Sequence, residues 1–160
     1  MNYVLTLVAF AAMGVGTAFS QTTAAASADS SAHLAHQAHQ AYVTAINSNN
    51  LETLLGMLTD DVVFMAPNDK PYVGKNAVRP RIAEYLKAYH THWDKPVKEF
   101  VASCDWAFER YSYTSTDTPV GDGAPVLDTG WGFVVYHHDA DGKWRVARDA
   151  WGSDHPPAGK

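Results

Sequence analysis

The chain has 160 residues, of which 46% are hydrophobic and 12% aromatic, so it is long enough for one globular domain with its own core. Its formal net charge of −5 and its lack of a basic run argue against nucleic acid and anionic membrane surfaces as partners. The single cysteine, Cys104, excludes an internal disulfide, and we expect it to be a small buried residue rather than a nucleophile.

The first residues have the pattern of an export signal. Residues 1–20 carry no charged side chain and end in the small-x-small sequence AFS before Gln21. They predict a cleaved signal peptide and a secreted or periplasmic protein without membrane contact after cleavage. An uncleaved membrane anchor is the alternative, although the stretch is short for a spanning helix. The small, low-complexity residues 21–31 predict a disordered linker before a domain at 32–155 and a tail at 156–160.

Helical spacing dominates the first half of the domain. We expect Asn49, with Glu52 three residues later, to cap a short second helix and Asn76 to cap a third. The first and third helices each have one apolar face. These faces carry Leu34, Ala38, Ala41, Tyr42, Ala45 and Ile46 in the first helix, and Val78, Ile82, Tyr85, Leu86 and Tyr89 in the third.

A buried strand that ends at Pro67 precedes the third helix. Strand-like alternation follows that helix. The runs at 97–116, 130–139 and 141–152 are long, aromatic and β-branched, and a tight Asp-Ala-Asp-Gly turn joins the last two. This order predicts an α+β fold in which a cone-shaped, curved antiparallel sheet wraps over about three N-terminal helices. Because so few helices cannot fill the concave side of the sheet, we expect an interior pocket there.

The last run places a carboxylate on the same strand face as an aromatic residue. Strict alternation puts Asp149 on one face with Ala147 and Trp151. The other face then carries Trp144, Val146, Arg148 and Ala150. An inward carboxylate is either a paired structural charge or part of a site.

Three stretches of the chain resemble one known superfamily. The helix ending AYVTAINSNNLETLLGMLTDDVVFMAP, the Gly74-Lys75 pair before the next helix and the closing DGKWRVARDAWGSD are similar to nuclear transport factor 2-like proteins. Within them, the chain resembles the ketosteroid isomerase-like and polyketide cyclase-like (SnoaL-like) branch, especially exported members of unknown function. The resemblance implies a cone-shaped α+β barrel with an interior pocket, and a homodimer joined through the sheet.

The ketosteroid isomerases themselves use an aspartate base, together with a tyrosine and a protonated aspartic acid that stabilise the oxyanion. The resemblance places their tyrosine on Tyr42, but it places the two aspartates on Ala66 and Val134. It therefore implies that this chain is not a ketosteroid isomerase by the usual mechanism. It also implies that Asp149 faces the pocket at a position those enzymes do not use.

Asp149 and Tyr42 each have two possible roles. Asp149 either accepts hydrogen bonds that fix the end of the barrel, or acts as a general base or polar anchor in an apolar pocket. Tyr42 either donates to a ligand carbonyl or is a core tyrosine bonded to Asp149. The predicted lining of the pocket is Tyr42, Met65, Tyr89, Trp106, Val134, Ala147, Asp149 and Trp151.

Several other side chains leave alternatives open. Trp131 and Phe133 either line the cavity or pack against a second subunit, and we assign them to the dimer face. The glycines between them, Gly130 and Gly132, suit close backbone approach or ligand space. The histidines at 33, 36 and 39 drift around their helix by about 60° per step, so we expect exposed histidines and no metal or cofactor.

Two functions remain. The first is an exported domain that binds a small, largely apolar molecule without established catalysis. The second is an isomerase, cyclase or dehydratase-type enzyme in which Asp149 transfers a proton and Tyr42 polarises a carbonyl. The loss of both aspartates favours the first, and the different inward carboxylate keeps the second open.

Overall fold

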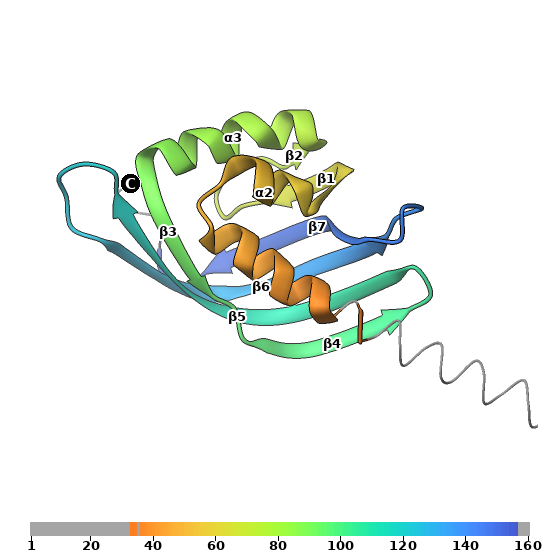
Figure 1. The fold of residues 1–160 in the computed structure, drawn as a ribbon. Coiled ribbons are helices and arrows are strands. Elements are labelled where there is room, and N and C mark those ends of the chain that lie inside the picture. The colour runs from red at the N-terminus through yellow and green to blue at the C-terminus, as the bar shows by residue number, and fades with distance from the viewer. Residues whose placement is uncertain (1–32, 35, 157–160) are drawn as a thin grey trace, which may run out of the picture.

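The computed structural model describes residues 33–34 and 36–156, and Figure 1 shows their arrangement. A helix over residues 36–47 comes first. The other elements are α2 (Leu51–Gly56), β1 (Leu58–Met65), β2 (Tyr72–Val73), α3 (Lys75–Ala88), β3 (Tyr89–Asp94), β4 (Val97–Ser103), β5 (Trp106–Pro119), β6 (Val126–His138) and β7 (Trp144–Ser153). The predicted signal peptide and linker, and residues 157–160, lie outside the described residues. Within the described part, no helix is both long enough and apolar enough to cross a bilayer.

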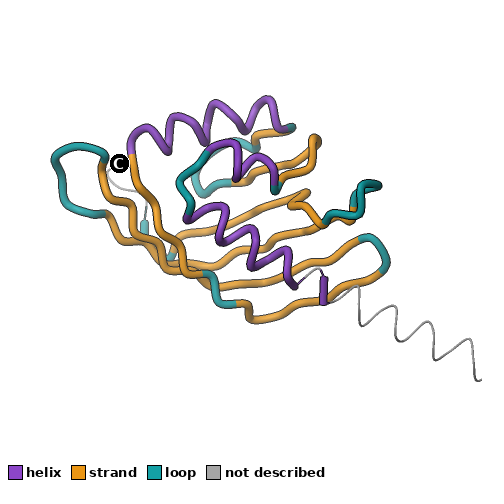
Figure 2. The backbone as a smooth tube through the Cα atoms, in the orientation of Figure 1, coloured by secondary structure: helices purple, strands orange, loops and turns teal. Residues whose placement is uncertain are grey.

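The strands form one seven-stranded sheet in the order β2-β1-β7-β6-β5-β3, with β4 also paired to β5. Neighbouring strands are antiparallel except β1 and β7, which run parallel. Figure 1 shows the long strands β5 and β6 curving beneath the helices, and Figure 2 shows the helices gathered on one side of the sheet. The predicted α+β fold, a curved and mostly antiparallel sheet wrapped over helices, is confirmed.

The core lies between the helices and the concave face of the sheet. Burial alternates along β5, so that one side of this strand packs inward and the other faces outward. The largest fully buried side chains are Tyr111, Tyr136, Leu58, Glu109, Val62, Val78, Val134 and Val146. One of them is a carboxylate, which has to be paired to be buried in such surroundings.

The convex face of the sheet is also rich in large apolar side chains. The ladder register places six of the exposed ones there: Met65, Val73, Val101, Trp106, Trp131 and Phe133. The glycines that alternate with the last two face inward, where a Cβ on Gly132 would lie 2.4 Å from the Tyr111 hydroxyl. Gly130 is likewise covered by Tyr113. The glycines therefore make room for two tyrosine rings rather than for a ligand.

Strand β7 departs from strict alternation at Ala147. The ladder to β6 skips this residue, so it is an extra residue in β7. Such a β-bulge shifts the alternation by one position. Trp144 and Val146 are therefore buried on the same inner face as Asp149 and Trp151, and their predicted placement on the opposite face is wrong. The predicted faces hold after the bulge, where Arg148 and Ala150 lie on the outer side.

Both predicted helix caps are displaced. Asn50, rather than Asn49, caps α2, and its side-chain oxygen accepts from the backbone N–H three residues on at 3.0 Å. Asn49 has φ +52 and instead binds the backbone of Thr91 in β3, by donating at 3.0 Å and accepting at 2.7 Å. Gly74, rather than Asn76, precedes α3. Asn49 thus links the first helix to the sheet.

The predicted exposure of four side chains is also wrong. Cys104 is exposed in the turn between β4 and β5, where it has φ +51. In the first helix, Leu34 and Ala41 are exposed, whereas His39 is only 4% exposed. The buried face of this helix is rotated toward His39 because a buried carboxylate of the sheet, Glu109, lies beneath it.

Candidate functional site

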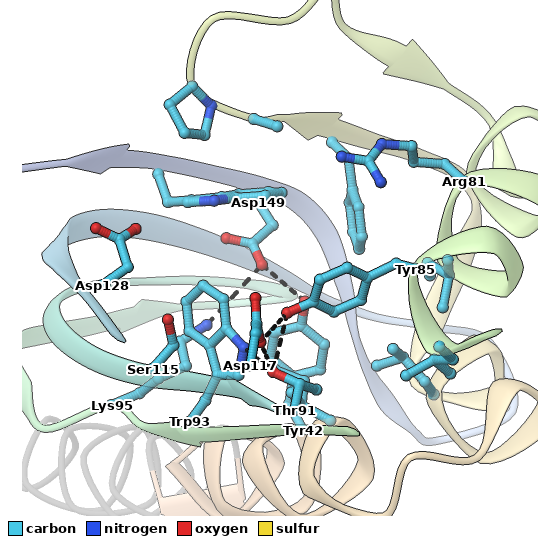
Figure 3. A pocket seen from close by; sticks show the side chains of 18 of the residues that line it. Tyr42, Arg81, Tyr85, Thr91, Trp93, Lys95, Ser115, Asp117, Asp128 and Asp149 are labelled. Atoms are coloured by element: carbon cyan, nitrogen blue, oxygen red, sulfur yellow. Dashed lines mark hydrogen bonds and ion pairs between the residues drawn. The ribbon is translucent and has the colours of Figure 1, made fainter. Parts of the chain in front are cut away.

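A cavity of about 270 Å³ lies between the concave face of the sheet and the helices (Figure 3). Most of its wall is aliphatic or aromatic and includes Ile46, Leu54, Phe64, Ile82, Trp93 and Trp151. A concave, mostly apolar space with a few polar groups is the usual form of a small-molecule site. The polar groups that reach the cavity therefore decide its chemistry.

Asp149 of β7 is the most buried carboxylate in the cavity wall. It is 4% exposed, and two tyrosine hydroxyls donate to it. The Tyr42 hydroxyl, from the first helix, lies 2.7 Å from Oδ2, and the Tyr111 hydroxyl, from β5, lies 3.1 Å from Oδ1. Hydrogen bonds to a charged acceptor are among the strong ones, so this arrangement joins helix and sheet. From the sequence, Tyr42 is either a donor to a ligand carbonyl or a core tyrosine bonded to Asp149. In this structure its hydroxyl is bonded to Asp149.

Lys95 lies beside this carboxylate and was not singled out from the sequence. It sits in the short connection between β3 and β4 and is 3% exposed. Its Nζ lies 3.9 Å from Asp149 Oδ2 and 3.9 Å from the centre of the Tyr111 ring. A lysine followed by a proline between two strands is typical of an exposed loop, so the sequence offered no clear signal.

Four residues form what we call the floor cluster, and burial shifts the pKa of the first three: Tyr42, Lys95, Tyr111 and Asp149. Burial lowers the pKa of Lys95, and the charges of Asp149 and Glu109 partly oppose that shift. Burial, reinforced by Asp149, raises the pKa of Tyr42 and of Tyr111 well above the ordinary value. Both tyrosines therefore remain neutral donors at physiological pH, whereas burial favours the neutral form of the lysine.

Two further carboxylates line the cavity, and each also receives two hydroxyl groups. Asp117 accepts from Tyr85 and, at 2.6 Å, from Thr91. Burial is the main cause of the raised pKa of Tyr85. Asp128 accepts from Tyr113 at 2.8 Å and from Ser153 at 2.5 Å. Three carboxylates of the cavity wall thus each accept from two hydroxyl groups, and among them only Asp149 also lies beside a buried lysine.

A second buried pair lies outside the cavity wall. His39 Nδ1 is 3.0 Å from Glu109 Oε1 and 2.9 Å from Oε2, and the Glu109 side chain is fully buried. Burial is the main cause of the raised pKa of the neighbouring Tyr136, and the charge of Glu109 adds to it. A histidine that the sequence predicted to be exposed is thus part of the core.

The structure brings only some of the predicted lining together. Tyr42, Asp149 and Trp151 reach the cavity, and Phe64 packs edge-on against Trp151 with 6.0 Å between ring centres. The other predicted residues lie elsewhere: Met65 and Trp106 on the convex face, Val134 and Ala147 buried in the sheet, and Tyr89 at the start of β3. Met65 and Trp106 are the outward members of their alternations, and this corrects their placement in the pocket.

Ala66 and Val134 occupy the two positions that the resemblance assigns to catalytic aspartates. Ala66 lines the cavity just after β1, and Val134 is fully buried in β6. Val134 pairs with Glu109 on one side and with Asp149 on the other. Position 134 therefore lacks a carboxylate, but the residue paired with it on each neighbouring strand carries one.

The chain matches a family model and several solved structures. A model described as a SnoaL-like domain matches residues 39–147. No curated protein matches the chain in sequence. A ketosteroid isomerase-like protein from Erwinia carotovora atroseptica is 26% identical, with a TM-score of 0.71 over 78% of this chain and 97% of that chain.

Two structures of lower identity show the fold alone. A candidate dehydratase of the nuclear transport factor 2-like family from Streptomyces avermitilis is 16% identical, with a TM-score of 0.69 over 81% of this chain and 99% of that chain. A candidate scytalone dehydratase from Novosphingobium aromaticivorans is 12% identical, with a TM-score of 0.67 over 86% of this chain and 89% of that chain. Because the family model spans more than half of the sequence, the chain belongs to the SnoaL-like domain family of the nuclear transport factor 2-like superfamily.

Proposed function

We propose that this protein binds a small, largely apolar molecule in the cavity, with the polar group of that molecule at the floor cluster. The observation that carries the proposal is a buried, ionisable floor in a cavity whose wall is mostly aromatic and aliphatic. Buried charges that line a cavity are far more common at functional sites than in ordinary cores. The aromatic walls would supply affinity, and the floor would select one polar group.

The ligand group that fits the floor is a hydrogen-bond acceptor. Both oxygens of Asp149 already accept from tyrosines, whereas the Lys95 ammonium has three N–H donors and one ion-pair contact at 3.9 Å within the described residues. A carbonyl oxygen beside Lys95 would therefore find a free donor. Three carboxylates in the wall, at positions 117, 128 and 149, outnumber its two cationic side chains, Arg81 and Lys95, and this balance disfavours an anionic ligand.

Proton transfer to or from such a ligand is the second candidate function. The close placement of Asp149 and Lys95 at the floor favours it, because a carboxylate and an amine together can accept and return a proton. The names of the dehydratase-like neighbours are consistent with reactions of this kind on the same fold.

Native mass spectrometry of the protein purified from its own host tests the binding proposal. We expect a discrete extra mass that is lost in Ala66→Trp, which fills the cavity from its rim, and kept in Ala140→Trp, which makes the same change in an exposed turn. Saturable quenching of Trp93 and Trp151 by small aromatic compounds gives a second readout, because both rings line the cavity. Wild-type protein with neither a retained mass nor saturable quenching would contradict the proposal.

We also propose that the protein is an exported homodimer joined through the convex face of the sheet. Exposed Trp131 and Phe133 support this, because contiguous apolar surface of that kind usually marks an interface. Phe133→Glu should yield a monomer in sedimentation velocity while the wild type sediments as a dimer.

A mature N-terminus at Gln21 would support export, and an intact N-terminus in a membrane fraction would contradict it.

A further inference from the structure

We infer that the amine of Lys95 is a nucleophile, and that it forms an imine with an aldehyde or ketone bound in the cavity. This inference rests on the proposed binding of a small apolar molecule. Its basis is the position of the lysine: the side chain is almost completely buried, yet it forms part of the cavity wall beside Asp149 (Figure 3). Among the described residues, Lys95 is the one lysine in that wall.

The surroundings of Lys95 hold its amine in a defined place. Three aromatic rings lie around Nζ, with their centres 3.9 Å away for Tyr111, 4.8 Å for Tyr42 and 5.9 Å for Trp93. Asp149 Oδ2 lies 3.9 Å away, which is too long for a direct hydrogen bond. The amine is therefore oriented by rings and by a nearby charge, and its lone pair and protons are not consumed by a close protein partner.

These surroundings also favour the reactive form of the amine. Only the neutral amine attacks a carbonyl carbon, and desolvation in an apolar pocket is a recognised way to produce it near neutral pH. Burial lowers the pKa of Lys95, while the charges of Asp149 and Glu109 act in the opposite direction. The hydroxyls of Tyr42 and Tyr111 stay neutral, and the faces of their rings attract an ammonium, so the rings act with the two carboxylates against the shift that burial causes.

The reaction balances without any further reagent. The lone pair of Nζ forms a bond to the carbonyl carbon, and the carbon–oxygen π bond opens as the oxygen takes a proton. One nitrogen proton is the proton that the oxygen takes, and the resulting carbinolamine then loses its hydroxyl group as water with a second proton. The proton left on the iminium nitrogen replaces that second proton by way of the adjacent Asp149 carboxylate, which ends as it began. The products are one imine and one water molecule, and neither partner is oxidised or reduced.

The chemistry of the cavity points to a neutral carbonyl compound with an aromatic or alkyl body. The apolar walls would hold that body, and the carboxylates in the wall disfavour an acidic group on it. Benzaldehyde is a suitable probe because it is small, aromatic and uncharged. Benzyl alcohol has nearly the same shape and cannot form an imine, so it reports binding alone.

The experiment treats the full chain with benzaldehyde and sodium cyanoborohydride, which reduces an imine to a stable amine, and locates the label by peptide mass spectrometry. Exposed Lys87 and Lys98 in the same molecule serve as internal references. We expect Lys95 to be labelled faster than the reference lysines near pH 7, by about tenfold for each unit by which its pKa lies below the ordinary value. Benzyl alcohol should slow labelling of Lys95 and leave Lys98 unchanged.

Two variants and one separate readout complete the test. Lys95→Met should lose the fast label, and Lys98→Met, a matched change on exposed β4, should keep it. Labelling of Lys95 no faster than of the reference lysines would overturn the imine. If benzyl alcohol still quenches tryptophan fluorescence saturably in that case, the binding proposal stands by itself. Absence of both signals would overturn both proposals.

Discussion

Glu109 and Asp149 are two buried carboxylates in the same row of the sheet, and they differ in what lies above them. Val134 of β6 separates them, since it pairs with Glu109 of β5 on one side and Asp149 of β7 on the other. Above Glu109 lies His39, and above Asp149 lies Tyr42, three residues further along the same helix. Only Asp149 borders the cavity.

The comparison shows how one row of a sheet can carry a structural charge and a candidate functional one. Glu109 has His39 in direct contact and no access to the cavity, so its side-chain partner lies within the core. Asp149 has neutral tyrosine donors in direct contact, and its basic partner, Lys95, is held 3.9 Å away. The looser pairing leaves an amine and a carboxylate facing a space that a ligand can enter.

The largest effect that separates the two carboxylates is expected from Glu109→Ala. Removing one member of a buried, hydrogen-bonded pair leaves the other, here His39, without its partner, and should lower the free energy of unfolding by about 3–5 kcal/mol. Urea denaturation followed by circular dichroism measures it. The affinity of the folded fraction for benzyl alcohol should stay unchanged, because Glu109 does not line the cavity.

Glu99→Ala on the neighbouring strand is the control for this change. Glu99 pairs with Arg110 at 3.3 Å on the exposed side of the sheet, so its loss should alter stability by less than about 1 kcal/mol. Equal effects of the two substitutions would mean that Glu109 is not a paired buried charge.

A smaller loss of stability, combined with a change in binding, is expected from Asp149→Asn. The amide keeps one acceptor but weakens the bonds from Tyr42 and Tyr111, which should lower the free energy of unfolding by about 2–3 kcal/mol. Unlike Glu109→Ala, it should also change the affinity for benzyl alcohol, measured by tryptophan fluorescence. A destabilised variant with unaltered affinity would make Asp149 structural in the same sense as Glu109.

The sequence predicted the fold and the inward Asp149 well because both depend on local periodicity. Helical spacing and strand alternation identify the elements, and Asp149 follows the inward pattern near the end of β7. The same argument failed for Trp144 and Val146, because a single bulged residue reverses the pattern and leaves no mark in the sequence. Periodicity is reliable only up to the nearest irregularity.

The contents of the floor cluster were less accessible to sequence reasoning. Lys95 comes from a short connection, and its burial depends on three rings contributed by separate elements. His39 resembled the exposed histidines near it, because its partner Glu109 is 70 residues away in sequence. Such pairings follow from tertiary packing, which no local pattern encodes.

Tyr42→Phe should have a still smaller effect and tests the Asp149 side alone. It removes one hydroxyl donor at 2.7 Å from a buried carboxylate, and we expect a loss of about 1–2 kcal/mol in the free energy of unfolding. Tyr72→Phe is the matched control, because its hydroxyl bonds exposed Asp69 at 2.9 Å. Similar losses in the two variants would show that burial adds nothing to the Tyr42–Asp149 bond.

The smallest expected effect is a slope with pH that only Lys95 should produce. Because its pKa is lowered in the folded chain, the unfolded chain binds more protons between that lowered value and the ordinary value of about 10.4. Stability then rises with pH across this window, by at most about 1.4 kcal/mol per pH unit for one group. Urea titrations from about pH 7 to about pH 9, below the ordinary tyrosine pKa, should show wild type gaining stability relative to Lys95→Met. Lys98→Met should follow the wild type. A constant difference between wild type and Lys95→Met would mean that Asp149 and Glu109 offset the burial of Lys95 completely, and the amine would then be no more reactive than one at the surface.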